Sequence, residues 1–493
     1  MNTVIGIDLG TQSLKVVFYD FENGTFAAVE SEPLELYRSD VGVAEQHADW
    51  WLDALKNVFA KVDANTRHSA RAIAVSGQQH GFVPVGKSDE VLAPVKLWCD
   101  TSTGAECEEI MDAFGGRDSC IEQAGNPIIP GYTASKVRWL AKSRRASYEQ
   151  LDCILLPHDY INFYLTGERC MEMGDASGTG FLDIRKRDWS DAMLQAIDPD
   201  RDLADCLPQL RLGNESIGSL RREAADELGL PRGIPIAIGG GDNMMGAIGT
   251  GNVRTGNVTM SLGTSGTVYA YADEPIVDPN GNIAAFCSST GGWLPLLCTM
   301  NCTVTTELMR ELLGADIASF EAQISMADRG ADGVITLPFF NGERTPDLPN
   351  ARGCLLGLSS HNMQPENLLR SAVEGATYAL KFGLDELASL GVQVEETVVT
   401  GGGAKSDKWR QLVADICATP VVVFEQDEGA AFGAALQALQ VVEAGSSIEE
   451  LVDEHLTRDA ARCCEPRKAA VDDYTEYYGH YQRAVGAIAR LYT

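Results

Sequence analysis

The same local pattern occurs twice in this sequence, once near the start of each half. Residues 5–19 have the pattern of a strand, a turn that begins Leu9-Gly10-Thr11, and a return strand. Residues 258–270 repeat that order around Leu262-Gly263-Thr264. Such an echo is typical of a duplicated core. Because 493 residues are too many for one core, the chain is predicted to fold as two domains, 1–250 and 251–493.

The first of these turns has the composition of a phosphate-binding loop. Asp8 ends the first strand, and Gly10, Thr11, Gln12 and Ser13 follow it. A glycine turn between strands can direct backbone N–H groups and hydroxyls at a phosphate, and an Asp before it can hold a hydrated magnesium ion. An ordinary hairpin turn is the alternative.

A second glycine turn displays a carboxylate. An uncharged apolar run, 234–238, predicts a buried strand that ends at Gly239-Gly240-Gly241, and a helical pattern starts at Met244. Asp242 and Asn243 therefore lie at a strand-to-helix turn, where glycines allow a ligand to approach closely. An accessible Asp here is expected to be ionised at neutral pH and able to accept a proton. A simple helix cap is the alternative.

Two further strands deliver polar or glycine-rich turns. Residues 72–76 predict a strand that ends at Gly77-Gln78-Gln79-His80-Gly81, which suits a small polar ligand. Residues 395–400 predict a strand before Gly401-Gly402-Gly403-Ala404, where a flat ring can lie against bare backbone. Helices are predicted at 364–390 and 471–491. His158 is interpreted as structural, because no nucleophile or second metal ligand lies near it in sequence.

Composition excludes several classes of partner. Seventy acidic and 39 basic residues give a formal charge of −31, which repels nucleic acid and anionic membranes. No apolar stretch approaches the ~20 residues of a membrane helix, and no basic signal-peptide lead precedes the first strand, so a cytoplasmic protein is expected. The 13 cysteines form no C-x-x-C pair and are interpreted as reduced core residues.

These motifs resemble the FGGY carbohydrate kinases, a family of the actin, heat-shock-70 and sugar-kinase ATPase superfamily. Residues 353–374 fit the longer FGGY signature throughout, and residues 131–142 fit the shorter one up to Ser143. The stretches 77–81, 239–243 and 342–346 look most like those of the family's xylulokinase members. The resemblance implies an α/β protein of two ribonuclease-H-like domains with a central cleft. It also implies ATP-dependent phosphorylation of a ketopentose, with ATP and Mg²⁺ as cofactors.

By the same resemblance, each functional residue is expected to have one role. Asp8 would bind magnesium through water, and Asp242 would be the general base. The residues expected to touch the sugar are Gln79, His80, Asp242 and Asn243. The residues expected to hold the nucleotide are Gly10, Thr11, Gln12, Ser13, Lys15, Gly263, Thr264, Gly402, Gly403, Ala404 and Asp407.

Several alternatives stay open at this stage. Related kinases often carry W-x-D-x-R where this chain has Trp98 to Ser102, so the identity of the acceptor sugar stays open. Ribulose, a hexulose or glycerol could replace xylulose, and the roles of Glu343 and Arg344 are open. The rival classes are a non-catalytic sugar-binding regulator and an ATP-driven chaperone or filament protein. A small sugar is the expected partner, and a homodimer is an open alternative.

Overall fold

The structure is a computed structural model that describes residues 1–39 and 41–492. Its chain forms two compact units. The first contains Met1–Val253, Ala272–Leu294 and Gln426–Leu456, and the second contains Arg254–Tyr271, Pro295–Glu425 and the chain from Thr457 onward. The expected boundary at residue 250 is a single cut, whereas these units are discontinuous in sequence.

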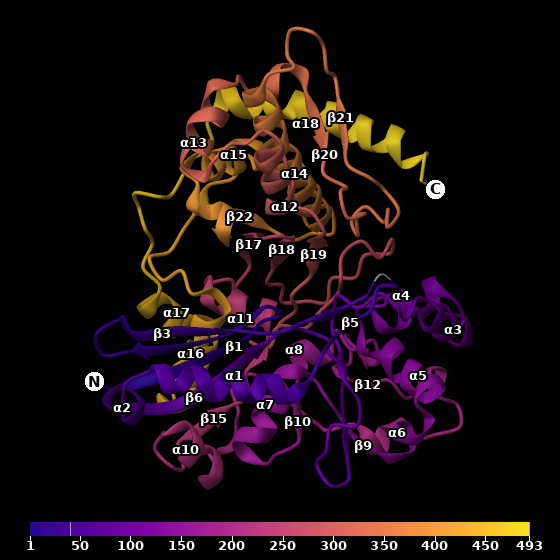
Figure 1. Cartoon of the computed structure of the whole chain (residues 1–493), viewed down its shortest axis with the longest axis vertical. Helices are drawn as coiled ribbons and strands as arrows, with labels where there is room; N and C mark the ends of the chain where they lie inside the picture. The colour runs from indigo at the N-terminus through magenta and orange to yellow at the C-terminus, as the bar shows by residue number, and fades with distance from the viewer. Residues whose placement is uncertain (40, 493) are drawn as a thin grey trace. The chain divides into compact units, whose positions relative to one another are not determined.

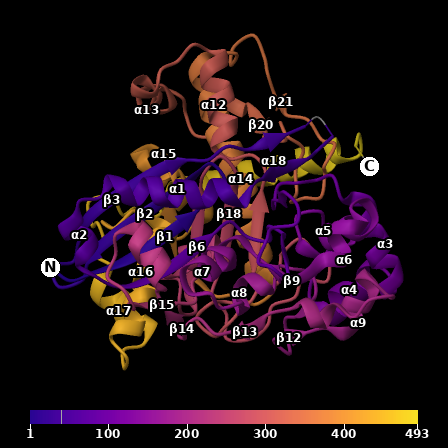
Figure 2. The same cartoon turned by 60° about the horizontal axis from the view of Figure 1, so that its bottom comes forward.

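A mixed sheet organises the first unit. β1 (Thr3–Leu9), β2 (Ser13–Asp20) and β3 (Thr25–Pro33) are antiparallel neighbours, and β6 (Ala70–Gly77) lies parallel to β1 on its other side. β15 (Pro235–Ala237) and β14 (Ser216–Ser219) follow beyond β6, and β16 (Gly240–Gly241) also pairs with β6. Figure 2 shows β1, β2 and β3 as neighbouring arrows near the indigo end of the colour scale, and β1 and β3 are also labelled in Figure 1.

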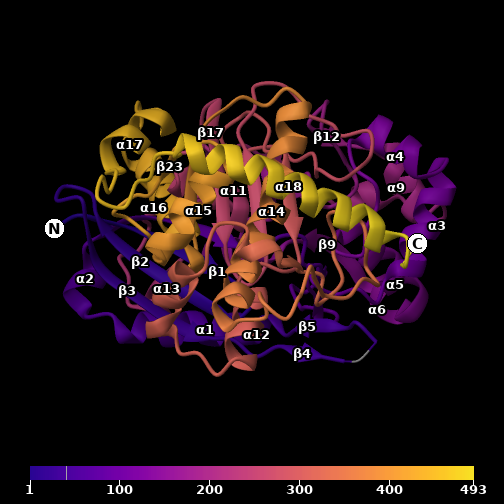
Figure 3. The ribbon, with the colours of Figure 1, turned by 90° about the horizontal axis from the view of Figure 1, so that it is seen from above.

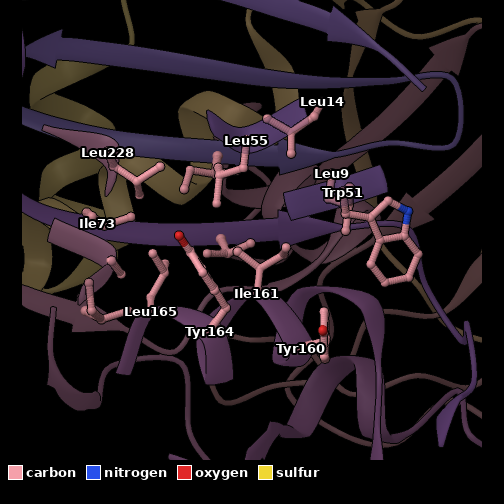
Figure 4. Packing of buried hydrophobic residues seen from close by; sticks show 14 of the residues in the cluster. Leu9, Leu14, Trp51, Leu55, Ile73, Tyr160, Ile161, Tyr164, Leu165 and Leu228 are labelled. Atoms are coloured by element: carbon pink, nitrogen blue, oxygen red, sulfur yellow. The ribbon is translucent and has the colours of Figure 1, made fainter. Parts of the chain in front are cut away.

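The two faces of this sheet are covered differently. Successive strand residues point to opposite faces, and Ile5, Ile7 and Leu9 pack with α1 (Ala48–Lys61), α7 (Pro157–Thr166) and α10 (Arg222–Leu228) in one apolar core. Figure 4 shows Leu9, Leu14 and Ile73 of the strands beside Leu55, Ile161 and Leu165 of the helices.

The opposite face carries α16 (Gly429–Val442), which also crosses α11 (Asp242–Gly249). A Cβ atom built on Gly6 would lie 1.8 Å from the carbonyl oxygen of Ala431, and one on Gly433 would lie 1.8 Å from that of Met245. Glycine is therefore required at both positions for α16 to approach the backbones of β1 and α11 this closely. Asp8 follows Gly6 by two residues, so its side chain lies on this face, with α11.

The second unit repeats the first sheet. β17 (Gly256–Leu262), β18 (Gly266–Ala270) and β19 (Leu296–Thr299) are antiparallel neighbours, and β22 (Val394–Thr400) lies parallel to β17 with β23 (Val421–Val422) beyond it. The order β19-β18-β17-β22-β23 matches the order β3-β2-β1-β6-β15 of the first unit. The echo in sequence is therefore an echo in structure, and the predicted fold class is confirmed.

Helices cover this second sheet. They are α12 (Thr303–Leu312), α13 (Ile317–Met326), α14 (Pro365–Ser389), α15 (Asp407–Cys417) and α18 (Lys468–Ala489), with β20 (Ile335–Leu337) and β21 (Cys354–Leu356) as an additional hairpin. Figure 3 shows α18 as the yellow helix running past α14 and α15. The helices predicted at 364–390 and 471–491 are α14 and α18, which confirms both.

The remaining elements belong to the first unit. The strands are β4 (Tyr37–Arg38), β5 (Ala44–Gln46), β7 (Val83–Gly86), β8 (Val95–Lys96), β9 (Leu151–Leu155), β10 (Cys170–Glu172), β11 (Leu182–Asp183), β12 (Asp188–Trp189) and β13 (Gln209–Arg211). The helices are α2 (Ala64–His68), α3 (Gly104–Phe114), α4 (Arg117–Ala124), α5 (Thr133–Ser143), α6 (Arg145–Gln150), α8 (Met173–Ala176), α9 (Asp191–Ile197) and α17 (Ile448–His455).

All 13 cysteines are free thiols, as predicted, but only nine are buried in the core; Cys99, Cys354, Cys463 and Cys464 are half-buried. Over residues 1–39 and 41–492, no helix combines the length and apolar character needed to cross a membrane. Within the same residues, no group of three or more His, Cys, Asp or Glu side chains could hold a metal ion.

Candidate active site

The carboxyl ends of β1 and β6 bring Asp8 into a small polar cluster. Asp8 is in register with Ser76 on one side and with Lys15 on the other. The Ser76 hydroxyl donates to Asp8 Oδ1 at 3.0 Å, whereas the Lys15 ammonium pairs with Glu428 at 3.0 Å. Burial raises the pKa of Asp8, although Ser76 and the charge of Lys15 oppose that shift. A half-buried carboxylate thus lies near the carboxyl end of β1, and one of its oxygens already accepts a hydrogen bond.

Hydrogen bonds of Thr11 to neighbouring side chains hold the turn after Asp8 in place. Its hydroxyl donates to Gln78 Oε1 and accepts from the Trp98 indole N–H, both at 3.0 Å. Gln46 donates to the Thr11 carbonyl at 2.9 Å and also binds Gln78. The Thr11 hydroxyl is therefore used by the protein itself, so the turn has backbone N–H groups and its exposed Gln12 and half-buried Ser13 to offer a ligand.

Asp242 begins α11 directly beside the loop that follows β6. Gly241 pairs with Gly77, so Asp242 and Gln78 leave the sheet side by side. The Asn243 amide donates to Gln79 Oε1 at 2.6 Å and to Asp242 Oδ1 at 3.0 Å. The structure thus brings together three of the four residues predicted to touch the sugar.

The expectation that Asp242 is ionised at neutral pH is wrong for the ligand-free protein. Burial, followed by the negative charges of Asp8 and Asp175, raises the pKa of Asp242 to about 8. The cause is the convergence of carboxylates from distant parts of the chain, which a local glycine turn does not reveal. The side chain keeps partial contact with solvent.

His80, the fourth predicted sugar residue, is held in an unusual backbone conformation. Its φ of 61° lies in the left-handed region, which non-glycine residues seldom adopt. Its carbonyl accepts from the buried Lys136 ammonium at 2.7 Å and from Thr133 at 3.1 Å. Its ring packs against Tyr132 and Phe286, each with a centroid distance of 5.3 Å.

Buried charges lie behind His80 that sequence reasoning did not identify as a group. Asp175 of α8 lies 3.2 Å from His80 Nδ1 and 3.3 Å from His158 Nδ1, and His158 Nε2 lies 2.9 Å from Asp159. His158 is thus fully buried between two carboxylates. The only sequence signal was that a helix starts with a His-Asp pair at 158–159 and that Asp175 stands among small residues.

In the second unit, the Leu262-Gly263-Thr264 turn joins β17 to β18 and contacts the start of α12. The carbonyl groups of Gly263 and Thr264 accept from the N–H groups of Thr303 and Cys302 at 2.9 and 3.0 Å. These bonds fix the turn against α12. Thr264 is exposed and Gly263 is half-buried, so both remain accessible to a ligand.

The glycine turn at 401–404 lies against that first turn within the second unit. A Cβ on Gly401, whose φ is 87°, would lie 2.9 Å from the Leu262 carbonyl, whereas one on Gly402 would meet nothing within 4 Å. Gly402 thus has the bare backbone that the sequence predicted. Arg410 of α15 donates to the Ala404 carbonyl at 2.6 Å and also pairs with the exposed Asp407.

Two further residues noted in the sequence, Ser102 and Glu343, have structural partners. Ser102, where related kinases often carry Arg, donates to Asp100, and Lys96 binds both residues. Glu343 accepts from the backbone N–H groups of Met300 and Arg344 at 2.6 and 2.8 Å. Glu343 therefore fastens its own loop.

A duplicated sheet with a polar turn after its first strand in each copy defines a class, the ATPases of the actin, heat-shock-70 and sugar-kinase fold. The models of the FGGY family of carbohydrate kinases match residues 3–249 with the N-terminal domain and 258–440 with the C-terminal domain. The chain belongs to this family.

Individual relatives agree with that membership. A xylulose kinase of Haemophilus influenzae is 40% identical over 97% of this chain and 98% of its own. Among solved structures, a ligand-bound xylulose kinase from Lactobacillus acidophilus has a TM-score of 0.91 and 25% identity, covering 100% of this chain and 99% of its own. A gluconate kinase from the same organism has a TM-score of 0.90 at 25% identity with the same coverage. Backbone similarity alone thus does not separate these two acceptors.

Proposed function

We propose that this chain transfers the γ-phosphoryl group of ATP to a hydroxyl of a ketopentose, with D-xylulose as the preferred acceptor. The observation that carries the proposal is the position of Asp242. It begins α11 beside the loop of Gln79 and His80, on the sheet face that also carries Asp8. The choice of D-xylulose is supported by the names of the relatives, among them the one that is 40% identical over nearly the whole chain.

Asp242 is proposed as the general base. An acceptor hydroxyl held by Gln79 and Asn243 would place its proton beside the Asp242 carboxylate, which accepts it as the new phosphorus–oxygen bond forms. A carboxylate in water with an ordinary pKa is a weak base. A pKa raised to about 8 by burial and by Asp8 and Asp175 makes Asp242 a stronger base.

The residues at Asp8 fit a magnesium ion bound with the nucleotide. Magnesium usually takes one or two carboxylates and keeps several waters beside the substrate phosphates, and Asp8 is a half-buried carboxylate with only one oxygen bonded to Ser76. When bound, the ion neutralises charge on the phosphates.

The nucleotide would be held mainly by backbone. In a chain of net charge −31, phosphates need local donors, which the N–H groups of residues 10–13 and of Gly263 and Thr264 supply. The purine and ribose would lie against Gly402, Gly403 and Ala404, because Gly402 leaves open space. Lys15 and Asp407 are candidates that now pair with Glu428 and Arg410, so binding would compete with those ion pairs. Use of ATP implies a cytoplasmic enzyme.

The test is a panel of acceptors. Purified protein with Mg²⁺ and ATP is assayed for ADP formation with D-xylulose, D-ribulose, a hexulose, glycerol and D-gluconate, and kcat/KM is compared. The proposal expects sugar-dependent ADP release with D-xylulose giving the highest kcat/KM. A higher kcat/KM for D-gluconate or glycerol would identify that compound as the preferred acceptor in place of D-xylulose. ADP release that does not depend on any acceptor would refute the kinase assignment.

A further inference from the structure

A chain of four buried side chains runs inward from the sugar loop. His80 Nδ1 lies 3.2 Å from Asp175 Oδ1, Asp175 Oδ2 lies 3.3 Å from His158 Nδ1, and His158 Nε2 lies 2.9 Å from Asp159 Oδ1. Asp175, His158 and Asp159 are at most 1% exposed. The contacts are close, but none of the three has the geometry of a hydrogen bond, so they are charge contacts.

These distances decide where the protons are. A carboxylate oxygen this close to a ring nitrogen attracts an N–H hydrogen and repels a lone pair, so the protonated form of each of the three nitrogens is favoured. His158 is therefore an imidazolium. Burial alone would lower its pKa, but the carboxylates of Asp159 and Asp175 raise the pKa of His158 to about 10. The two histidines in turn lower the pKa of Asp175 to about 2, against the effect of burial.

The orientation of His80 is fixed from its other sides as well. Its backbone N–H donates to Asp175 Oδ1 at 3.3 Å, and Lys136 and Thr133 hold its carbonyl. A Cβ built on Gly178 would lie 1.8 Å from His80 Cε1, so the chain at residue 178 lies directly against the ring. Tyr132 and Phe286 pack on it. These contacts hold the ring in one orientation, in which Nδ1 lies beside the Asp175 carboxylate.

We infer that Asp175, itself held by His158 and Asp159, is a positioning residue that fixes His80 as the neutral tautomer protonated at Nδ1. Its Nε2 then carries a lone pair and accepts a hydrogen bond from a hydroxyl of the acceptor sugar. The statement about the sugar rests on the proposed function, whereas the statement about the tautomer does not.

This state of His80 has a consequence for specificity. A ring nitrogen with a lone pair binds a hydroxyl donor and repels a carboxylate. The ionised carboxylate of Asp175 lies beside the ring and adds to that repulsion. The arrangement therefore favours a neutral ketose over an aldonate such as gluconate, a distinction that the backbone comparison leaves open.

The direct experiment is a long-range ¹⁵N–¹H correlation spectrum of the ligand-free, full-length protein labelled at histidine, with His80 assigned by the spectrum of His80→Gln. The inference expects His80 Nδ1 at a protonated shift and Nε2 at an unprotonated shift at pH 7.5, and His158 protonated on both nitrogens. His80 protonated at Nε2 alone or at both nitrogens would overturn it.

Kinetics test the positioning role. An Asn side chain has one acceptor oxygen for two histidines, so Asp175→Asn forces one ring nitrogen to face an N–H and lose its proton. The expected result is a rise of about 10- to 100-fold in the KM for D-xylulose, with the KM for ATP nearly unchanged. The matched control is Asp183→Asn, a buried carboxylate of the same segment that binds turn amides and Lys186.

The outcomes separate the two hypotheses. Equal changes in both KM values, or a sugar KM as little changed in Asp175→Asn as in the control, would overturn the positioning role. If Asp175→Asn does not fold, Asp159→Asn is used, with a smaller rise in the sugar KM expected, and the wild-type spectrum still decides the tautomer. If no ketose is phosphorylated but His80 is protonated at Nδ1, the proposed function fails and the tautomer assignment stands.

Discussion

Replacing Asp242 by Asn is expected to remove activity and to stabilise the fold at the same time. The Asn side chain has the same shape and keeps an acceptor for the Asn243 amide, which now donates to Asp242 Oδ1 at 3.0 Å. Loss of the proton acceptor is expected to lower kcat by at least ~10²-fold. ATP affinity should change little, because the residues proposed to hold ATP are left intact.

The stabilisation follows from the raised pKa of Asp242. A shift from 3.8 to about 8, at about 1.4 kcal/mol per unit, has an upper bound of about 6 kcal/mol. Partial solvent contact and charge sharing with Asp8 reduce the expected gain to roughly 1–3 kcal/mol. An active-site carboxylate that weakens the fold is a known form of the compromise between stability and function.

The raised pKa of Asp242 determines how the stability of the wild type changes with pH. A carboxyl whose pKa is raised by folding binds its proton more tightly when folded, so the wild type is relatively most stable below the unfolded pKa of about 4. Its stability falls as the pH rises towards the folded pKa of about 8. The advantage of Asp242→Asn should therefore be absent near pH 4, grow through neutral pH and level off above pH 8.

The assay is urea unfolding of both proteins, free of ligand and divalent cation, at pH 5, 7 and 9. A difference in the free energy of unfolding that is independent of pH would refute the account of the raised pKa. Near-normal turnover in Asp242→Asn would show that Asp242 is not the base. The wild-type kcat/KM gives a parallel test, since its acid limb should have a midpoint near pH 8 rather than near pH 4.

Three other outcomes are expected. Thr11→Val leaves Gln78 and the Trp98 indole without their hydrogen-bond partner, so the free energy of unfolding should fall by about 1–3 kcal/mol. MgATP binding should weaken more than sugar binding. Urea unfolding and calorimetry measure these two effects, with Thr11→Ser as the control. Gly402→Ala should fold normally, because its Cβ meets nothing within 4 Å, yet raise the KM for ATP several-fold by covering the bare backbone. Gly433→Ala should fail to fold stably, because its Cβ would lie 1.8 Å from the Met245 carbonyl; a normal melting temperature would contradict the packing of α16.

Much of this architecture could be predicted because its signals are local. A Leu-Gly-Thr turn between two apolar strands and three glycines before a helix determine nearby backbone, and the strands and helices expected from them are present. Asp242 could be placed at the start of a helix for the same reason.

The rest depends on contacts between residues distant in sequence. Phe286 and Glu428 lie in later segments that return to the first unit, where they contact His80 and Lys15, and no local pattern announces that return. The turn at Thr11 has a composition suited to phosphate binding, but the Thr11 hydroxyl already forms hydrogen bonds with Gln78 and Trp98. A pKa depends on charges brought near by the fold, so the state of Asp242 could not be read from its own turn.

The most direct test of the central claim is identification of the product. The protein is incubated with D-xylulose, ATP and Mg²⁺, and the mixture is followed by ³¹P NMR. The proposed function predicts one equivalent of a pentulose phosphomonoester, coupled to protons of a terminal carbon, for each ADP formed. ADP formed with inorganic phosphate and no phosphomonoester, or no ADP formed with any sugar of the panel, would contradict it.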